Sequence, residues 1–459
     1  MFEFGRELRR LMGATEAPTG FQDGLTGGDG ALLELIDLNL LAAEAKAADV
    51  AAGRVGARDR PARLLEAAMV WRELARRSGE SYALRKAAAQ AEAAANGFGA
   101  EGRDQGLARA RVEQALCAML GAELYGDDGL NAAAALRLTE AGQVSGIPAA
   151  LAELAKAGLA GRKALAKGDM DAALAAAANF DAPLTAVETA GRRRPALRLL
   201  AANELAVRAD IMAGCGSRLK DRTLLDRAAR DLSMCVASLD IAYEPLTFAR
   251  VKALHGQTMA ALGELTGDPG LVADGVTVLA DALDAIPKDH SPLDWARIQA
   301  MLGCALQMMG DALDNERAFE QAITCFDRAG LVLKLNPALS LRAIVANGRA
   351  LCLARSAELS GDLAVLDAAE AAFKGELTEL NPSLEPVTWA VAQTNLARIY
   401  ESRAEITGRD NGGRAKGIMA LNAALEVFAE HGLRSLSDMA LQGIERLREH
   451  QRPPAGRIV

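Results

Sequence analysis

The sequence of 459 residues has few aromatic residues, few histidines and no catalytic signature. Aromatic residues make up 4% of the chain, and alanine and leucine far outnumber β-branched residues, which favours helices over strands. The four histidines are far apart, so they suggest neither a shared metal site nor a catalytic pair. Phosphate-loop, zinc-protease and serine-hydrolase motifs are missing. The sequence therefore predicts an all-α protein that is not an enzyme and has no cofactor or metal.

Long apolar runs and a basic charge balance are missing as well. No run reaches the roughly 20 residues that cross a bilayer, and residues 1–13 lack the apolar core of a secretory signal. The net charge of −8 argues against nucleic acid as a partner. The six cysteines form no CxxC pair, which is typical of free, buried thiols in a reducing cytoplasm. We therefore expect a cytoplasmic protein without stable membrane insertion.

An internal repeat of 47 residues organises the chain. ELYGDDGL (123–130) and ELTGDPGL (264–271) lie 141 residues apart, which is three such periods. Different residue types keep the same spacing: Pro245, Pro292 and Pro386 form one series, and Phe248, Trp295 and Trp389 form another. Because independent residue types share one register, the period indicates stacked structural units.

Each unit reads as a longer helix A followed by a shorter helix B. In one unit the apolar residues Trp295, Ile298 and Leu302 recur at helical spacing, and the next segment repeats the pattern with Phe319, Ile323, Phe326 and Leu331. Within the quoted octapeptides, a glycine can end helix A in the left-handed conformation and the following aspartate can cap helix B. The predicted pairs are 62–78 with 82–97, 104–125 with 129–141, 147–167 with 170–180, 193–215 with 221–238, 245–265 with 270–286, 292–312 with 316–331, 338–360 with 363–376, and 384–407 with 412–429. Helices at 31–52 and 434–449 are expected to cap the array.

Several of these strings resemble the tetratricopeptide repeat. NLARIY (395–400) is similar to its helix A signature, Ala322, Phe326 and Ala329 match its helix B pattern, and LNP at 335–337 and 380–382 is similar to its closing segment. PLDWARIQAMLGCAL further resembles a long-period bacterial subgroup. The resemblance implies a right-handed α-α superhelix of about eight hairpins plus capping helices, whose A helices line a groove for peptides or protein surfaces. The period departs from the usual 34 residues, so HEAT-like arrays stay open as the alternative.

The predicted organisation has three parts. These are a short amphipathic segment with a flexible linker (1–29), the solenoid (30–450) with degenerate repeats in 30–190 and clearer ones in 191–429 before the capping helix, and a C-terminal tail (451–459). The N-terminal segment carries Phe2, Phe4, Leu8, Arg9 and Arg10 as candidate docking residues. Three placements of this segment stay open: packing on the solenoid, docking on a partner or a second copy, and contact with a membrane surface.

Polar positions of the A helices are the candidate partner-binding residues. They are Arg250, Lys252, His255, Arg297, Gln299, Asn347, Arg349, Gln393, Asn395 and Arg398. Gln299 lies at the edge of an apolar stripe, so it makes either a hydrogen bond between helices or a contact to a bound peptide. The basic run GRRRPALR (191–198) either forms a solvated loop or attracts an acidic segment of a partner.

The functional hypothesis is a non-catalytic scaffold or adaptor that binds a protein or peptide segment in the groove. The alternatives are a sensor for a small molecule or signalling peptide, and a regulatory subunit of an enzyme assembly. Self-association through the N-terminal segment is a further expectation.

Overall fold

The described part of the chain consists of helices joined by short turns and contains no strand. A computed structural model describes residues 33–54, 59–142, 144–192, 194–334, 338–380, 382–383, 386–431 and 433–449. The predicted N-terminal segment 1–29, with Phe2, Phe4, Leu8, Arg9 and Arg10, and the tail 451–459 lie outside these residues.

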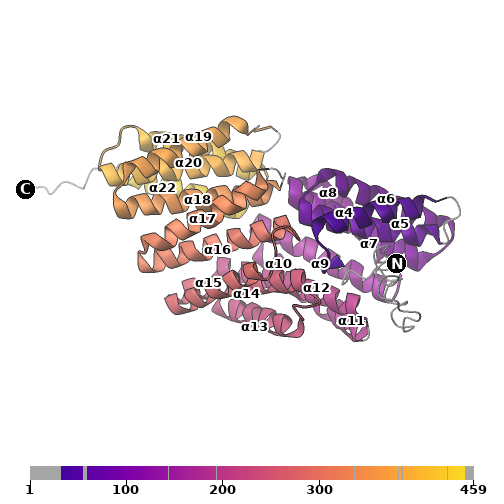
Figure 1. Cartoon of the computed structure of the whole chain (residues 1–459). Coiled ribbons are helices and arrows are strands. Elements are labelled where there is room, and N and C mark those ends of the chain that lie inside the picture. Colours follow the sequence, from indigo (N-terminus) through magenta and orange to yellow (C-terminus); the bar gives the residue numbers. More distant parts are fainter. Residues whose placement is uncertain are drawn as a thin grey trace, which may run out of the picture.

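The helices follow one another in antiparallel pairs (Figure 1). Their bounds are α4 Leu38–Gly53, α5 Arg60–Ser78, α6 Ser81–Ala100, α7 Asp104–Tyr125, α8 Asp128–Ala141, α9 Ile147–Lys167, α10 Met170–Ala178, α11 Asp181–Gly191, α12 Pro195–Leu219, α13 Arg222–Ser238, α14 Pro245–Thr266, α15 Pro269–Asp284, α16 Pro292–Leu313, α17 Glu316–Leu333, α18 Leu339–Ser360, α19 Leu363–Glu379, α20 Pro386–Thr407, α21 Gly413–Glu430 and α22 Arg434–Glu449. These bounds lie within a few residues of most predicted pairs, so the all-α hairpin architecture is confirmed.

The 47-residue spacing appears in the backbone itself. Residues with positive φ end the A helices at Gly79, Gly126, Lys220, Gly267, Asp314, Gly361 and Gly408, which fall on one 47-residue series. The residue after each of five of these turns accepts amide hydrogen bonds at the start of helix B; these residues are Asp127, Asp221, Asp268, Asn315 and Asp362. The repeated octapeptide is therefore a helix stop followed by a helix cap, as the sequence indicates.

Three details differ from the sequence-based expectations. The third hairpin turns at Gly168, as the predicted pair 147–167 with 170–180 indicates and five residues ahead of the 47-residue series, but an additional helix, α11, which was not predicted, fills the rest of the unit. The first capping helix begins at Leu38 rather than at residue 31, because residues 34–36 form a turn and Asp37 caps the helix. Leu331 is exposed, whereas its neighbours Val332 and Leu333 complete the buried side of α17.

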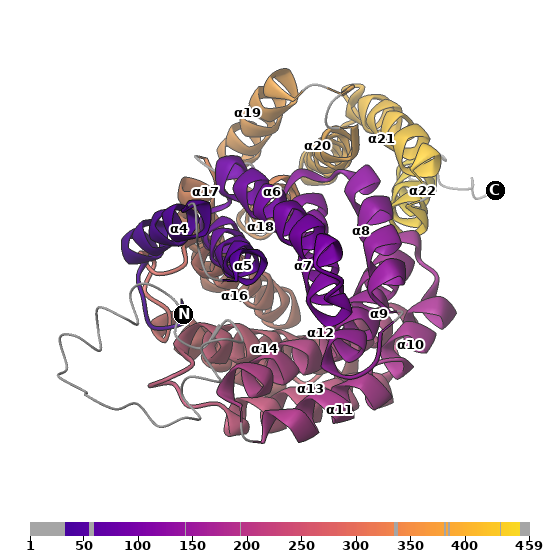
Figure 2. The same cartoon turned by 90° about the vertical axis from the view of Figure 1, so that its right-hand side faces the viewer.

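The pairs wind into a right-handed superhelix, which Figure 2 shows along its axis with the A helices on the inside. One turn of the superhelix spans the five hairpins that begin with α5, α7, α9, α12 and α14. After that turn α16 lies against α5, and α18 lies against α7. The inside of the superhelix is therefore formed by A helices from two successive turns.

Candidate functional site on the inner wall

The inner faces of the A helices carry charged side chains that meet across the two turns. We call this surface the inner wall and define it by five residues: Arg76 on α5, Glu123 on α7, Arg250 on α14, and Asp294 and Arg297 on α16. Each makes an ion pair with a residue of another A helix. The apolar faces of the same helices pack within and between hairpins, which leaves these polar positions turned toward the axis.

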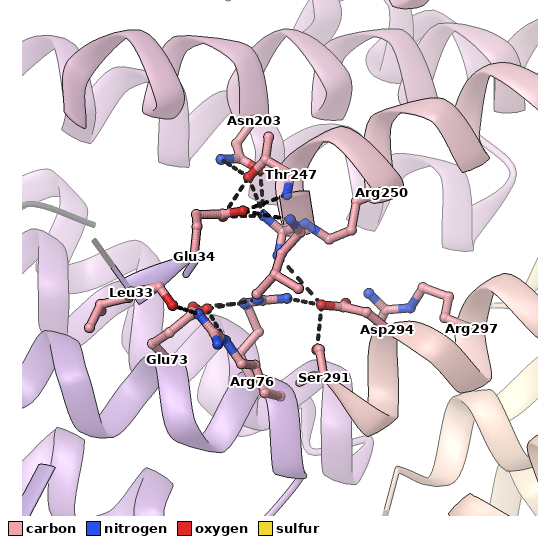
Figure 3. A network of polar contacts seen from close by, with 12 residues as sticks. Leu33, Glu34, Glu73, Arg76, Asn203, Thr247, Arg250, Ser291, Asp294 and Arg297 are labelled. Atoms are coloured by element: carbon pink, nitrogen blue, oxygen red, sulfur yellow. Dashed lines mark hydrogen bonds and ion pairs between the residues drawn. The ribbon is translucent and has the colours of Figure 1, made fainter. Parts of the chain in front are cut away.

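Asp294 is the centre of the first cluster on the inner wall (Figure 3). Its side chain is 2% exposed. Its Oδ2 atom accepts from Arg76 Nη1 at 2.6 Å, from Arg250 Nη1 at 3.5 Å and from the Ser291 hydroxyl at 2.7 Å. Burial alone raises the pKa of this carboxyl, but the surrounding guanidinium groups and the hydroxyl outweigh it and hold the pKa well below its usual range. Asp294 is therefore a buried anion that joins α5, α14 and α16.

Glu34 enters this cluster from the turn that precedes α4. Its Oε2 atom accepts from the backbone amides of Leu246 and Thr247, each at 2.8 Å, and its Oε1 atom accepts from the Thr247 hydroxyl at 2.8 Å. Arg250 lies 3.7 Å from the same carboxylate and donates to the Thr247 hydroxyl at 2.7 Å. A carboxylate at a helix N-terminus satisfies free amides and is favoured by the helix dipole. Residue 34 therefore caps α14, which lies more than 200 positions later in the chain.

Arg77, next to Arg76 on α5, holds the backbone of the same turn. Its guanidinium is fully buried and donates to the carbonyl of Ile36 at 2.9 Å and to the carbonyl of Leu33 at 2.6 Å. Its Nε atom donates to Glu73 at 2.6 Å. The turn is therefore fixed to α5 through its main chain and to α14 through the Glu34 side chain.

A second cluster is formed by side chains of α5, α7, α9, α12 and α16. Glu123 pairs with Arg297 from the next turn and lies 3.9 Å from Arg162 on α9. Glu204, on α12, is half-buried and faces Arg162 and Arg72. Burial raises the pKa of Glu204 to about 7, and the two arginines only partly offset this. The ion pairs of the inner wall thus lie beside a carboxyl, Glu204, whose pKa burial raises.

The predicted binding residues fall into different environments. Arg250 and Arg297 lie on the inner wall, where both are bound to acidic residues. Lys252 instead pairs with Asp281 on α15 at 3.0 Å, and Arg349 pairs with Asp327 on α17 at 2.6 Å. His255 lines a shallow depression against α13 together with Asp226, Arg230 and Ser233. These last three predicted residues contact B helices of the solenoid.

The remaining predicted residues lie deeper or later in the chain. Gln299 is 1% exposed and Asn395 is 4% exposed, so both lie within the packing of the helices. The side-chain oxygen of Gln299 has no hydrogen-bond partner among the described residues. Asn347 and Gln393 are half-buried, and Arg398 donates to Glu401 at 3.2 Å and to Glu358 at 3.4 Å. As contacts to a partner, all ten positions stay predictions.

Sequence reasoning missed the acidic half of the inner wall. Glu34, Glu73, Glu123 and Asp294 were not among the predicted site residues, although they neutralise its arginines. For Asp294 a signal exists in the PLDWA string, where the aspartate lies three residues after Ser291 in the first turn of α16. Glu34 offers no such signal, because its partners belong to a distant helix.

Other chemistry-bearing groups are few in the described part of the chain. No group of three or more histidine, cysteine or acidic side chains is arranged there to hold a metal ion. All six cysteines are unpaired, and five of them are buried. None of the described helices combines the length and the apolar character needed to cross a bilayer.

Comparison with known proteins gives only loose structural likenesses. No family model matches the chain, and no curated protein matches it. One similar solved structure is a Rap protein complexed with competence and sporulation factor, with 13% identity, a TM-score of 0.46, and coverage of 83% of this chain and 96% of that chain. Another is a circular tandem repeat protein with novel repeat topology and enhanced subunit contact surfaces, with 14% identity, a TM-score of 0.27, and coverage of 85% and 97%. Both overlaps are too loose to carry an argument about function.

Proposed function

We propose that the chain is a non-catalytic scaffold or adaptor that holds a peptide or protein segment on its inner wall. In this proposal the array is a tetratricopeptide-like solenoid of the long-period kind that the sequence resembles, and it works in the cytoplasm. Five buried thiols and the absence of any disulfide among the described cysteines are in keeping with that compartment.

One observation carries the proposal: next to Arg250 of the inner wall, the solenoid already binds a short peptide segment, namely the chain's own residues 33–37. The guanidinium of Arg77 binds two main-chain carbonyls of this segment, and the amides at the start of α14 bind its carboxylate. Main-chain hydrogen bonds are independent of the side chains of the bound segment, whereas the carboxylate contact selects for its sequence. The same two contacts would serve for a segment supplied by another protein.

Site-specific photocrosslinking tests where the partner binds. Ile344, on α18, is 50% exposed and shares the 47-residue register of Arg250 and Arg297, which places it on the continuation of the inner wall. Leu331, on α17, is 68% exposed and serves as the matched control on a B helix. We expect a benzophenone amino acid at Ile344, introduced into the full chain in cells, to give a discrete crosslinked protein.

The same amino acid at Leu331 is expected to give no crosslinked band at that mass. Equal crosslinking from both positions, or crosslinking from Leu331 alone, would place the partner on the outer surface and contradict the proposal. Sequencing the peptide crosslinked to Ile344 would then identify the partner.

A further inference from the structure

The contacts of residues 33–37 form a site with defined chemistry. We call it the cradle and define it by Arg77 on α5 and by Leu246 and Thr247 at the start of α14. The cradle presents two guanidinium donors, two backbone amides and one hydroxyl toward the turn. All of these are donors, so the cradle accepts a segment that brings only acceptors: one carboxylate and two carbonyls.

The cradle is poorly suited to standing empty. Arg77 is fully buried, and without the turn two of its donor groups would face no acceptor. The amides of Leu246 and Thr247 would also lose their acceptor. A buried donor without a partner costs about 1 to 3 kcal/mol, and more when it is charged. Exchange for another segment with the same acceptors is therefore far less costly than simple release of the turn.

The occupant shows which side chains the site selects. Leu33 and Ile36 are 5% and 4% exposed, whereas Leu35 between them is 45% exposed. Glu34 supplies the carboxylate, and the bound carbonyls belong to Leu33 and Ile36. The pattern is an apolar residue, a glutamate, any residue and a second apolar residue, folded into one turn.

We infer that the cradle is a binding site for a carboxylate-bearing peptide turn of a partner protein, and that residues 33–37 of the chain occupy it and exclude that partner. This inference rests on the proposed function and names the ligand chemistry of a site that adjoins the inner wall, since Thr247 contacts Arg250. Residues 33–37 are a competing internal ligand, joined covalently to α4, so a partner must displace them. Binding is therefore weak until the internal turn is loosened.

The cradle is also connected to the contact between the two turns of the superhelix. Thr247 donates to Glu34 and accepts from Arg250, and Arg250 in turn reaches Asp294 on α16. Asp294 is the partner of Arg76 on α5. When a different segment binds in the cradle, the contact of Thr247 with Arg250 changes, and this change affects the ion pair between Arg76 and Asp294 that joins α5 and α16.

A competition experiment with the full chain tests the inference. The probe is a fluorescein-labelled peptide with the sequence of residues 30–40, GALLELIDLNL. We expect fluorescence anisotropy to show at least tenfold tighter binding to the Glu34→Ala chain than to the unmodified chain, because the variant lacks the internal carboxylate. The same peptide with glutamine in place of its glutamate should bind the variant at least tenfold more weakly.

Two further variants distinguish replacement of residues 33–37 by the peptide from a general destabilisation of this segment. Asp37→Asn alters the same segment at the cap of α4, outside the cradle, and should bind the peptide as weakly as the unmodified chain. Thr247→Val combined with Glu34→Ala should abolish the gain in affinity. If circular dichroism shows that Glu34→Ala does not fold, Glu34→Gln replaces it, since its side chain keeps one acceptor oxygen for the amides of α14.

The inference is overturned if the peptide binds the unmodified chain and the Glu34 variant equally, or binds neither. It is also overturned if the glutamate and glutamine peptides bind alike. Crosslinking from Ile344 without any peptide binding would remove the cradle inference and leave the proposed function intact. If Ile344 gives no crosslink and the peptide does not bind, the proposed function is contradicted as well.

Discussion

Replacing Asp294 with alanine is expected to lower the free energy of unfolding by roughly 3 to 5 kcal/mol, as is usual when one partner of a buried ion pair is removed. The carboxylate is 2% exposed and lies between Arg76 and Arg250, at 2.6 and 3.5 Å. Without it, two guanidinium groups face each other in a largely buried site. The contact between α5 and α16 should weaken first, because Asp294 provides the ion pair between those helices.

Urea unfolding followed by circular dichroism measures this loss. Asp281→Ala is the matched control: this aspartate also pairs with a cation of α14, Lys252, but it is 57% exposed and its loss should change stability by less than about 1 kcal/mol. A loss for Asp294→Ala no larger than that of the control would contradict the role assigned to the cluster.

The Asp294 cluster also gives a pH dependence with a definite sign. The folded-state pKa of Asp294 is depressed, so its stabilisation is fully present above the pKa of an unfolded aspartate, about 3.9. The stabilisation is lost as the pH falls from there through the lower folded-state pKa. The Asp294→Asn chain should therefore show a shallower loss of stability on acidification than the unmodified chain.

Phe326→Ala is expected to destabilise the chain by roughly 3 to 5 kcal/mol. Phe326 projects from α17 and is fully buried, with its ring against Gly303 on α16 and Gly348 on α18. A Cβ atom at Gly303 would come within 2.8 Å of the ring, and one at Gly348 would come closer still. The two glycines therefore leave the space that the ring fills, and alanine at residue 326 leaves a cavity between two hairpins.

A double-mutant cycle with Gly348→Ala measures this fit. Gly348→Ala should be destabilising in the unmodified chain and close to neutral in the Phe326→Ala chain, where the ring is absent. Leu331→Ala on the same helix is the control and should change stability by no more than about 0.5 kcal/mol, because Leu331 is 68% exposed. Additive effects of the two substitutions would contradict direct packing of the ring on Gly348.

The hairpins could be predicted from sequence because their signals are local. A left-handed residue, a capping aspartate and an apolar stripe all lie within one unit, and the 47-residue spacing repeats them. The additional helix α11 departs from that spacing. Its Pro183 lies in the first helical turn, where a proline is compatible with a new helix. The repeat pattern alone predicts no third helix in a unit.

The inner wall could be predicted only in part. Arg250 and Arg297 lie one period apart, which predicts a shared face, and in the structure each pairs with an acidic residue of another A helix. Their acidic partners could not be predicted, because those contacts depend on the pitch of the superhelix. Arg76 and Asp294 are 218 residues apart, and no local pattern fixes how far the array rises per turn.

The distance between the two turns at α5 and α16 is the most direct test of the superhelical arrangement. Spin labels at Glu80 and Lys288, both exposed, report it by pulsed electron resonance in a Cys304→Ala background, since the other five thiols are buried. Packed helices lie about 10 Å apart, so we expect one short distance between the labels, below roughly 30 Å. A distance of roughly 50 Å or more, as expected if five intervening hairpins were stacked without returning to α5, would contradict it.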